Sequence, residues 1–77
     1  MSSEFSERDA NLFGRNVCLI RRRRGLTQEQ LAERAGLSRD TVHKLEGGKR
    51  FPRLATVLDL ADTLAVDPCA LLEGLRP

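Results

Sequence analysis

Apolar residues recur along this chain at helical spacing, and no segment shows the alternation of apolar and polar residues that indicates a strand. A first helix is expected over residues 9–24, because Phe13, Val17 and Ile20 fall on one face of it. The basic residues at its end suit a helix C-terminus, and Gly25 suits the position that follows. The pattern therefore predicts an all-α fold.

Two shorter helices with their own start signals are expected next. Thr27 and Gln30 have the spacing of a capping box, and Gly36 can take the positive φ of a tight turn after the second helix. Ser38 is a strong N-cap for a third helix, which Gly47 and its neighbour should end. Two short capped helices joined by a glycine-containing turn are typical of proteins that present a helix to the major groove of DNA.

The rest of the chain predicts two further helices. Residues 54–64 place an apolar stripe on one face, made of Val57, Leu60, Ala61 and Leu64. Asp67 as N-cap and Pro68 at the first helical position begin a short fifth helix that runs to about residue 72. A chain of 77 residues has room for one small core. We expect one compact five-helix domain over residues 9–77, preceded by a flexible tail over residues 1–8.

Charge is unevenly distributed along the chain, although its net value is only +2. Residues 15–53 hold eleven lysines or arginines against four carboxylates, a local charge of +7, whereas residues 1–14 carry −2 and residues 54–77 carry −3. This asymmetry favours one side that faces a polyanion and an opposite acidic side, with a merely solvated basic face as the alternative.

Several classes of function are disfavoured by the composition. Cys18 and Cys69 lie far apart, and with a single histidine in the chain they predict neither a metal site nor a disulfide framework. We expect each thiol to be a small buried hydrophobe in a reducing compartment, with redox sensing as the alternative.

No apolar run reaches the roughly 18 residues of a membrane span and the chain does not start like a signal peptide, so a cytoplasmic location is expected. Because no catalytic constellation can be assembled, we expect no enzyme activity, no cofactor and no small-molecule ligand.

The run RRRRGLTQEQLAERAGLSRDTVHKLEGGKRFPRLATVLDLADTL resembles the lambdoid repressor/Cro type of helix-turn-helix domain, also called the XRE type, which includes the controller proteins of restriction-modification systems. The resemblance covers about residues 12–72 and rests on four pieces. They are Gly-Leu-Thr-Gln before the second helix, the Ala-Gly-Leu-Ser turn, the Leu-Glu-Gly end of the third helix and Pro-x-Leu before the fourth. The resemblance implies a lambda-repressor-like domain that regulates transcription and binds a palindromic operator in double-stranded DNA as a homodimer.

The resemblance also implies that the third helix is the recognition helix. Arg39 matches a base-reading position, where its forked donors can grip guanine O6 and N7. Asp40 and Lys44 occupy contact positions; Asp40 either accepts from a cytosine amino group or, as we favour, orients Arg39 through an ion pair. Thr41 and His43 are further candidates, toward a thymine methyl or a phosphate. If His43 contacts phosphate, binding should strengthen as the pH falls through the range in which histidine titrates.

Phosphate contacts are expected at the starts of the second and third helices and in the loop after the third. The family presents a glutamine to a phosphate at the position of Gln28. The residues assigned to phosphate binding are Thr27, Gln28, Ser38, Lys49, Arg50 and Arg53.

The arginine run over residues 21–24 cannot all contact DNA, because successive helical residues point about 100° apart. The resemblance implies that Arg21 pairs, partly buried, with Glu46, so both are assigned to structure. The remaining arginines of the run, residues 22–24, are expected to form a solvated helix end, with phosphate contacts as the alternative.

A dimer surface is expected at Leu58, beside the inward stripe of the fourth helix, together with Leu72 and Leu75. For Leu72, a place in the core is an open alternative. An antitoxin that binds a toxin and controls its own operon is the alternative function, and it is disfavoured because only about five residues follow the fifth helix.

Overall fold

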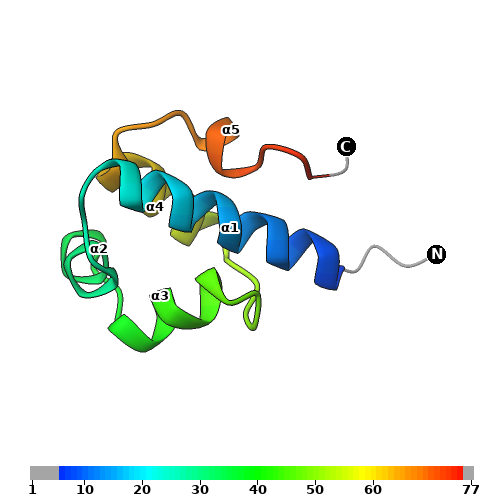
Figure 1. Ribbon diagram of the computed structural model, residues 1–77, viewed down its shortest axis with the longest axis horizontal. Coiled ribbons are helices and arrows are strands. Elements are labelled where there is room, and N and C mark those ends of the chain that lie inside the picture. The colour runs from blue at the N-terminus through cyan, green and yellow to red at the C-terminus, as the bar shows by residue number, and fades with distance from the viewer. Residues whose placement is uncertain (1–5, 76–77) are drawn as a thin grey trace.

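Five helices account for the regular structure of residues 6–75, the part of the chain that the computed structural model describes. They are α1 Glu7–Arg23, α2 Gln28–Ala35, α3 Arg39–Glu46, α4 Leu54–Leu64 and α5 Pro68–Leu71 (Figure 1). Within these residues there is no strand, which confirms the predicted all-α fold. In Figure 1, α3 and α5 lie on opposite sides of α1, so the longest helix separates α3 from α5.

Side-chain caps set the starts of four of these helices. Thr27 and Gln30 form a complete capping box, with bonds of 3.0 and 2.9 Å between the side chain of each and the backbone N–H of the other. The Ser38 hydroxyl accepts from the Thr41 N–H at 3.0 Å, and the Asp67 carboxylate accepts from the Cys69 N–H at 2.8 Å. Each bond satisfies a backbone donor that the first turn of a helix leaves without a partner.

The first helix begins earlier than the sequence predicts. Ser6 accepts from the Asp9 N–H at 3.0 Å and caps a helix that starts at Glu7, with two carboxylates in its first turn. The helix therefore starts two residues before the expected position, and residues 7 and 8, which were expected to lie in the tail, are helical. Residues 1–5 of the predicted tail lie outside the described residues.

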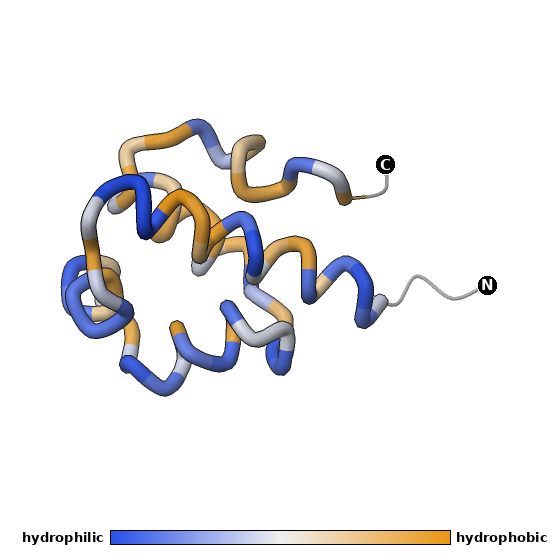
Figure 2. The backbone as a smooth tube through the Cα atoms, viewed as in Figure 1, coloured by the Kyte–Doolittle hydropathy of each residue, from blue (hydrophilic) through white to orange (hydrophobic). Residues whose placement is uncertain are grey.

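The core is built from one apolar face of each helix. Phe13 and Val17 of α1, Leu31 of α2 and Leu60 of α4 have no exposed surface, and Leu45 of α3 is 1% exposed. Figure 2 shows apolar positions in orange along α1 and on α4 behind it, whereas α2 and α3 carry mostly hydrophilic positions. The short helices therefore contribute a few core side chains each and leave most of their surface for other roles.

Close backbone packing holds α3 against α1. Gly14 is buried, and a Cβ atom at this position would overlap the carbonyl oxygen of Leu45 and lie 2.7 Å from that of Glu46. Glycine is required at residue 14 because no side chain fits between the two backbones.

The last arginine of the basic run has a structural role that the sequence did not predict. Arg24 donates from Nε to the carbonyl oxygen of Leu64 at 2.8 Å and from Nη2 to that of Ala65 at 3.2 Å. These carbonyls end α4, where a cation is favourable and the backbone acceptors need partners. Arg24 is exposed like Arg22 and Arg23, as expected of a solvated helix end, but its guanidinium is also attached to the end of α4.

The two cysteines do not have the buried environments that were expected. Cys18 is half-buried beside Arg21, whose Nη2 lies 3.7 Å from its sulfur, and Cys69 is exposed on the single turn of α5. The hydrogen bond and the negative charge of Asp67 raise the pKa of the Cys69 thiol, so its exposure does not make it a strong nucleophile. Over residues 6–75 no helix has the length and apolar character needed to cross a membrane.

Candidate nucleic-acid interface

The third helix divides its side chains between the core and the outer surface. Val42 and Leu45 are each 1% exposed, and their spacing turns the rest of the helix outward. The candidates for base reading that lie exposed on this helix are Arg39, Asp40, His43 and Lys44. Three of them, Arg39, Asp40 and His43, line one shallow hollow, so they present their polar groups to a common space.

Asp40 forms an ion pair with Lys44 and not with Arg39. Its Oδ2 lies 3.1 Å from Lys44 Nζ, one helical turn further on. The favoured orienting role toward Arg39 is therefore wrong in this structure, because adjacent residues on a helix diverge by about 100° while residues i and i+4 share a face. Both side chains of the pair are at least half exposed, so the pair adds little to stability and is available to an external partner.

Thr41 links the start of α3 to the basic loop. Its hydroxyl oxygen accepts from Ser38 Oγ at 2.8 Å and from Arg50 Nη1 at 3.3 Å. Thr41 is half-buried, and its hydroxyl oxygen already accepts two hydrogen bonds. Of the expected base-reading residues it is therefore the least accessible to DNA. The same contacts bring Arg50 and Ser38, both candidates for phosphate binding, to one edge of α3.

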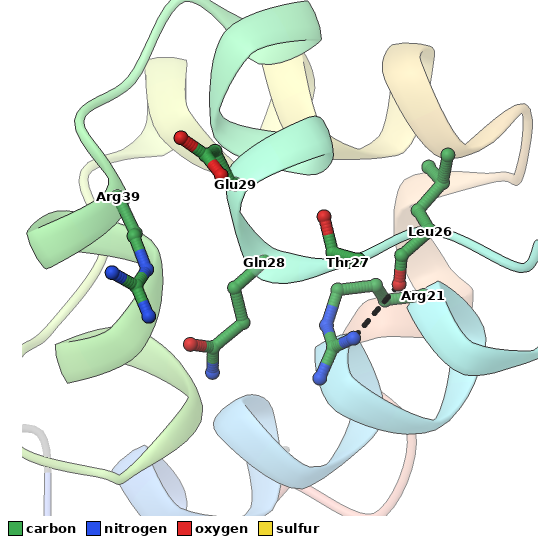
Figure 3. Close-up of a pocket in the computed structure, with 6 residues that line it drawn as sticks. All are labelled: Arg21, Leu26, Thr27, Gln28, Glu29 and Arg39. Carbon is green, nitrogen blue, oxygen red and sulfur yellow. Dashed lines mark hydrogen bonds between the residues drawn. The ribbon is translucent and has the colours of Figure 1, made fainter.

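The N-terminus of α2 lies beside the start of α3. Thr27, Gln28 and Glu29 line one hollow together with Arg21, Leu26 and Arg39, as Figure 3 shows. In this view Gln28 and Arg39 extend from different helices into the space between them. Backbone N–H groups at a helix N-terminus favour an anion, which makes this hollow suited to a phosphate group.

Gln28 is held by two side chains of α3. Its Nε2 donates to Glu46 Oε1 at 2.9 Å, and its Oε1 lies 3.4 Å from His43 Nδ1. The glutamine thus connects the first residue of α2 to the middle and the end of α3. Its side chain has a structural partner on each side, which the sequence assignment to phosphate alone did not include.

Arg21 and Glu46 form the ion pair that the resemblance implied. Arg21 Nε donates to Glu46 Oε2 at 2.6 Å and Nη2 donates to Oε1 at 3.0 Å, with side chains only 11% and 5% exposed. Arg21 Nη1 also donates to the Leu26 carbonyl oxygen at 2.8 Å, drawn as the dashed line in Figure 3. The pair joins α1, the α1–α2 turn and the end of α3, and this bidentate geometry is the strong form of such a contact.

The pair also fixes the charge of Glu46. Burial disfavours the ionised carboxylate and is the largest single influence, but hydrogen bonds from Arg21 and Gln28, with the charge of Arg21, outweigh it and lower the pKa of Glu46. The hydrogen bond to Glu46 raises the pKa of Arg21 in return. Both groups are ionised at neutral pH.

Exposed cations follow α3. Lys49, Arg50 and Arg53 are all exposed in the segment that leads into α4. The Lys49 N–H donates to the Lys44 carbonyl oxygen at 2.9 Å, which fastens the start of this loop to the end of α3. Arg53 takes the N-cap position of α4, although its side chain makes no capping bond.

The residues expected at a dimer surface fall in two places. Leu58 is exposed on α4, whereas Leu72 is exposed and Leu75 half-buried at the α5 end. The alternative place of Leu72 in the core is wrong, because Leu71 fills that position with no exposed surface and Leu72 is 41% exposed. A one-turn helix has too few residues for its inward position to be read from periodicity.

Sequence reasoning missed Leu54, which is 74% exposed one turn before Leu58 on α4. The i, i+4 spacing of the two leucines was the signal that identifies them as neighbours on one face. Phe51, half exposed just before this helix, is a further large apolar residue near the same end.

Two short helices joined by a tight turn, the second carrying a polar and basic outer face beside a basic loop, define a helix-turn-helix DNA-binding protein. The chain belongs to the helix-turn-helix family, whose model, described as "Helix-turn-helix domain", matches residues 12–73. This confirms the resemblance to the XRE, or Cro/C1, type, and the protein is a transcriptional regulator with this DNA-binding fold.

Three similar proteins illustrate the relationship. The uncharacterized HTH-type transcriptional regulator y4dJ of Sinorhizobium fredii is 39% identical over 61 residues, which cover 79% of each chain. The uncharacterized HTH-type transcriptional regulator YazB of Bacillus subtilis is 34% identical over 58 residues, which cover 75% of this chain and 84% of YazB. The crystal structure of the restriction-modification controller protein C.AhdI from Aeromonas hydrophila superposes with a TM-score of 0.81 at 38% identity, covering 83% of this chain and 97% of that one.

Proposed function

We propose that this protein is a sequence-specific regulator that binds a palindromic site in double-stranded DNA as a homodimer, with α3 in the major groove. The observation that carries the proposal is the division of α3 between two buried apolar residues and an exposed face with Arg39, His43 and Lys44. The contacts of Gln28 with His43 and of Arg50 with Thr41 connect the α2 N-terminus and the basic loop to this same helix. Candidate base contacts are thereby flanked on both sides by candidate phosphate contacts.

The residues of this surface divide into two groups. Arg39 is the principal base reader, because its guanidinium is exposed at the start of α3 and makes no contact that competes with DNA among the described hydrogen bonds and ion pairs. Further contacts with neighbouring bases come from four other residues of α3, which are Asp40, Thr41, His43 and Lys44. The groups that position the domain on phosphates are those of Thr27, Gln28, Ser38, Lys49, Arg50 and Arg53.

Dimerisation supplies the affinity that one small domain lacks. Non-specific DNA binding alone gives dissociation constants of only about 10⁻⁴ to 10⁻⁶ M. Two recognition helices about 34 Å apart on a symmetric dimer read two half-sites one helical turn apart. Leu58, together with its neighbour Leu54, is the principal candidate for the contact between copies, and Leu72 with Leu75 forms a second apolar patch.

Selection of bound sequences from random duplex DNA tests this proposal. We expect a palindromic consensus whose half-sites are separated by about one helical turn. The absence of any consensus from the selected pool would overturn sequence-specific recognition, and a single unrepeated half-site would overturn the symmetric dimer.

A further inference from the structure

The orientation of the Gln28 amide is set by Glu46. A carboxylate accepts hydrogen bonds and has no hydrogen to give, so the atom of the amide that approaches it must be the donor nitrogen. Gln28 Nε2 lies 2.9 Å from Glu46 Oε1, in agreement with this requirement. Glu46 is itself fixed by two hydrogen bonds from Arg21, at 2.6 and 3.0 Å. The amide oxygen of Gln28 is therefore the atom left for its other neighbour.

That neighbour is His43 on the outer face of α3. His43 Nδ1 lies 3.4 Å from Gln28 Oε1, and His43 is exposed in the hollow that Arg39 and Asp40 also line. An amide oxygen only accepts, so the hydrogen of this contact has to reside on Nδ1 of the imidazole. In a neutral imidazole, the hydrogen bonds of the ring determine which nitrogen carries the hydrogen. In this contact, the acceptor oxygen of Gln28 favours the hydrogen on Nδ1.

We propose that Gln28 is a positioning residue that holds neutral His43 with its hydrogen on Nδ1, so that Nε2 is a hydrogen-bond acceptor that reads an exocyclic amino group in the major groove. The tautomer follows from the contacts among Arg21, Glu46, Gln28 and His43, whereas the reading of a base rests on the proposed function. In the major groove, only adenine N6 and cytosine N4 present amino donors. His43 therefore selects adenine or cytosine on the strand it contacts.

Such a histidine complements Arg39. Guanine O6 and N7 and thymine O4 are acceptors, which the donors of an arginine satisfy and an unprotonated Nε2 cannot. The recognition helix thus presents a donor group at its first residue and an acceptor group one turn later. An acceptor among the cations of this surface adds discrimination that positive charge alone does not supply.

Nitrogen NMR of the imidazole tests the tautomer without any DNA. The chain contains one histidine, so the two-bond proton–nitrogen correlation spectrum of the ring belongs to His43 alone. At pH 8 we expect Nδ1 to resonate as the protonated nitrogen and Nε2 as the unprotonated one. In Gln28→Met, which keeps the length of the side chain and removes both polar atoms, we expect the hydrogen to shift toward Nε2.

Glu33→Met is the control, because Glu33 is exposed on the same helix and lies outside the Thr27–Gln30 capping box that starts it. Its imidazole spectrum should equal that of the wild type. A wild-type spectrum with the hydrogen on Nε2, or identical spectra for the wild type and Gln28→Met, would overturn the proposal whatever the protein does with DNA.

Selection from random duplexes then tests the reading of the base. At the position contacted by His43 we expect adenine or cytosine, and Gln28→Met should reduce that preference by about twofold to tenfold, the contribution of one neutral hydrogen bond. Because Gln28 is also a proposed phosphate contact, some loss of affinity that is equal for all four bases is expected; an unchanged preference for adenine or cytosine in Gln28→Met would overturn the positioning role in recognition. If the wild type selects no sequence, the proposed function fails, while the NMR result still decides the tautomer.

Discussion

The guanidinium of Arg21 binds the carboxylate of Glu46 through two hydrogen bonds, which connect the last turn of α1 to the end of α3. The two residues are 25 positions apart, and both side chains are nearly inaccessible to water. Glu46 also accepts from Gln28, so one carboxylate connects α1, α2 and α3. We therefore expect the pair to control both the stability of the fold and the geometry of the surface that we propose to face DNA.

Removal of one partner of this pair should destabilise the domain strongly. In Glu46→Ala the Arg21 charge stays buried without its carboxylate, and we expect a loss of about 3 to 5 kcal/mol in the free energy of unfolding, measured by urea denaturation. Glu33→Ala removes an exposed carboxylate of α2 and should change stability by no more than about 0.5 kcal/mol. An unchanged unfolding curve for Glu46→Ala would refute the structural role of the pair.

The same pair should give the stability a characteristic dependence on pH. The pKa of Glu46 is lowered from its ordinary value of 4.5, so its contribution is complete above that value and is lost as the pH falls through the lower folded-state value. Glu46→Gln removes this titration. The stability difference between the wild type and Glu46→Gln should therefore narrow as the pH is reduced from 7 to about 3. A difference that stays constant over this range contradicts an ionised, hydrogen-bonded Glu46.

The close contact between α1 and α3 predicts that an alanine is destabilising at residue 14 but not at residue 47. Gly14→Ala places a Cβ against the backbone carbonyls of Leu45 and Glu46, which cannot move aside cheaply, and we expect a loss of about 1 to 3 kcal/mol. Gly47→Ala is the control, since its Cβ lies 3.4 Å from the nearest atom, the His43 carbonyl oxygen, and its φ of −84° suits any residue. Equal melting temperatures for the two variants would contradict the close approach of the helices.

A charged side chain at residue 58 tests the predicted dimer surface. Leu58→Glu puts a carboxylate into the proposed contact between copies, and sedimentation velocity should show self-association weakened by about tenfold or more. Leu58→Met is the control, because it keeps an apolar side chain of similar volume at the same position, and its self-association should equal that of the wild type. If Leu58→Glu associates as the wild type does, Leu58 is not part of the interface.

Local features of the fold were predictable from the sequence because their causes are local. Thr27, Ser38 and Asp67 cap the helices they were expected to cap, and the apolar spacing identified buried residues such as Val17 and Leu45. These signals act over a few residues of the chain. Contacts between distant segments were not readable in the same way, as the bond from Arg24 to the carbonyl of Leu64, 40 residues away, illustrates.

In the proposed DNA-binding surface, too, local features could be predicted from the sequence and contacts between distant segments could not. The exposed side chains of α3 follow from its buried ones, so the candidates for base reading could be chosen from helical geometry and the family resemblance. The attachment of Gln28 to Glu46 spans 18 residues and depends on how α2 and α3 cross. The Asp40–Lys44 pair was within reach of sequence rules, since its i, i+4 spacing is a local signal that outweighs adjacency to Arg39.

The most direct measurement of the central claim compares binding to a selected palindromic duplex with binding to a scrambled duplex over a series of salt concentrations, by fluorescence anisotropy. Arg39→Ala should lower the ratio of the two affinities by a factor that corresponds to about 1 to 3 kcal/mol, because it removes a base contact. Arg53→Ala should weaken both equally and reduce the slope of log affinity against log salt by about 0.9, because it removes a phosphate contact. An unchanged ratio in Arg39→Ala would contradict the account of α3 as the helix that reads the sequence.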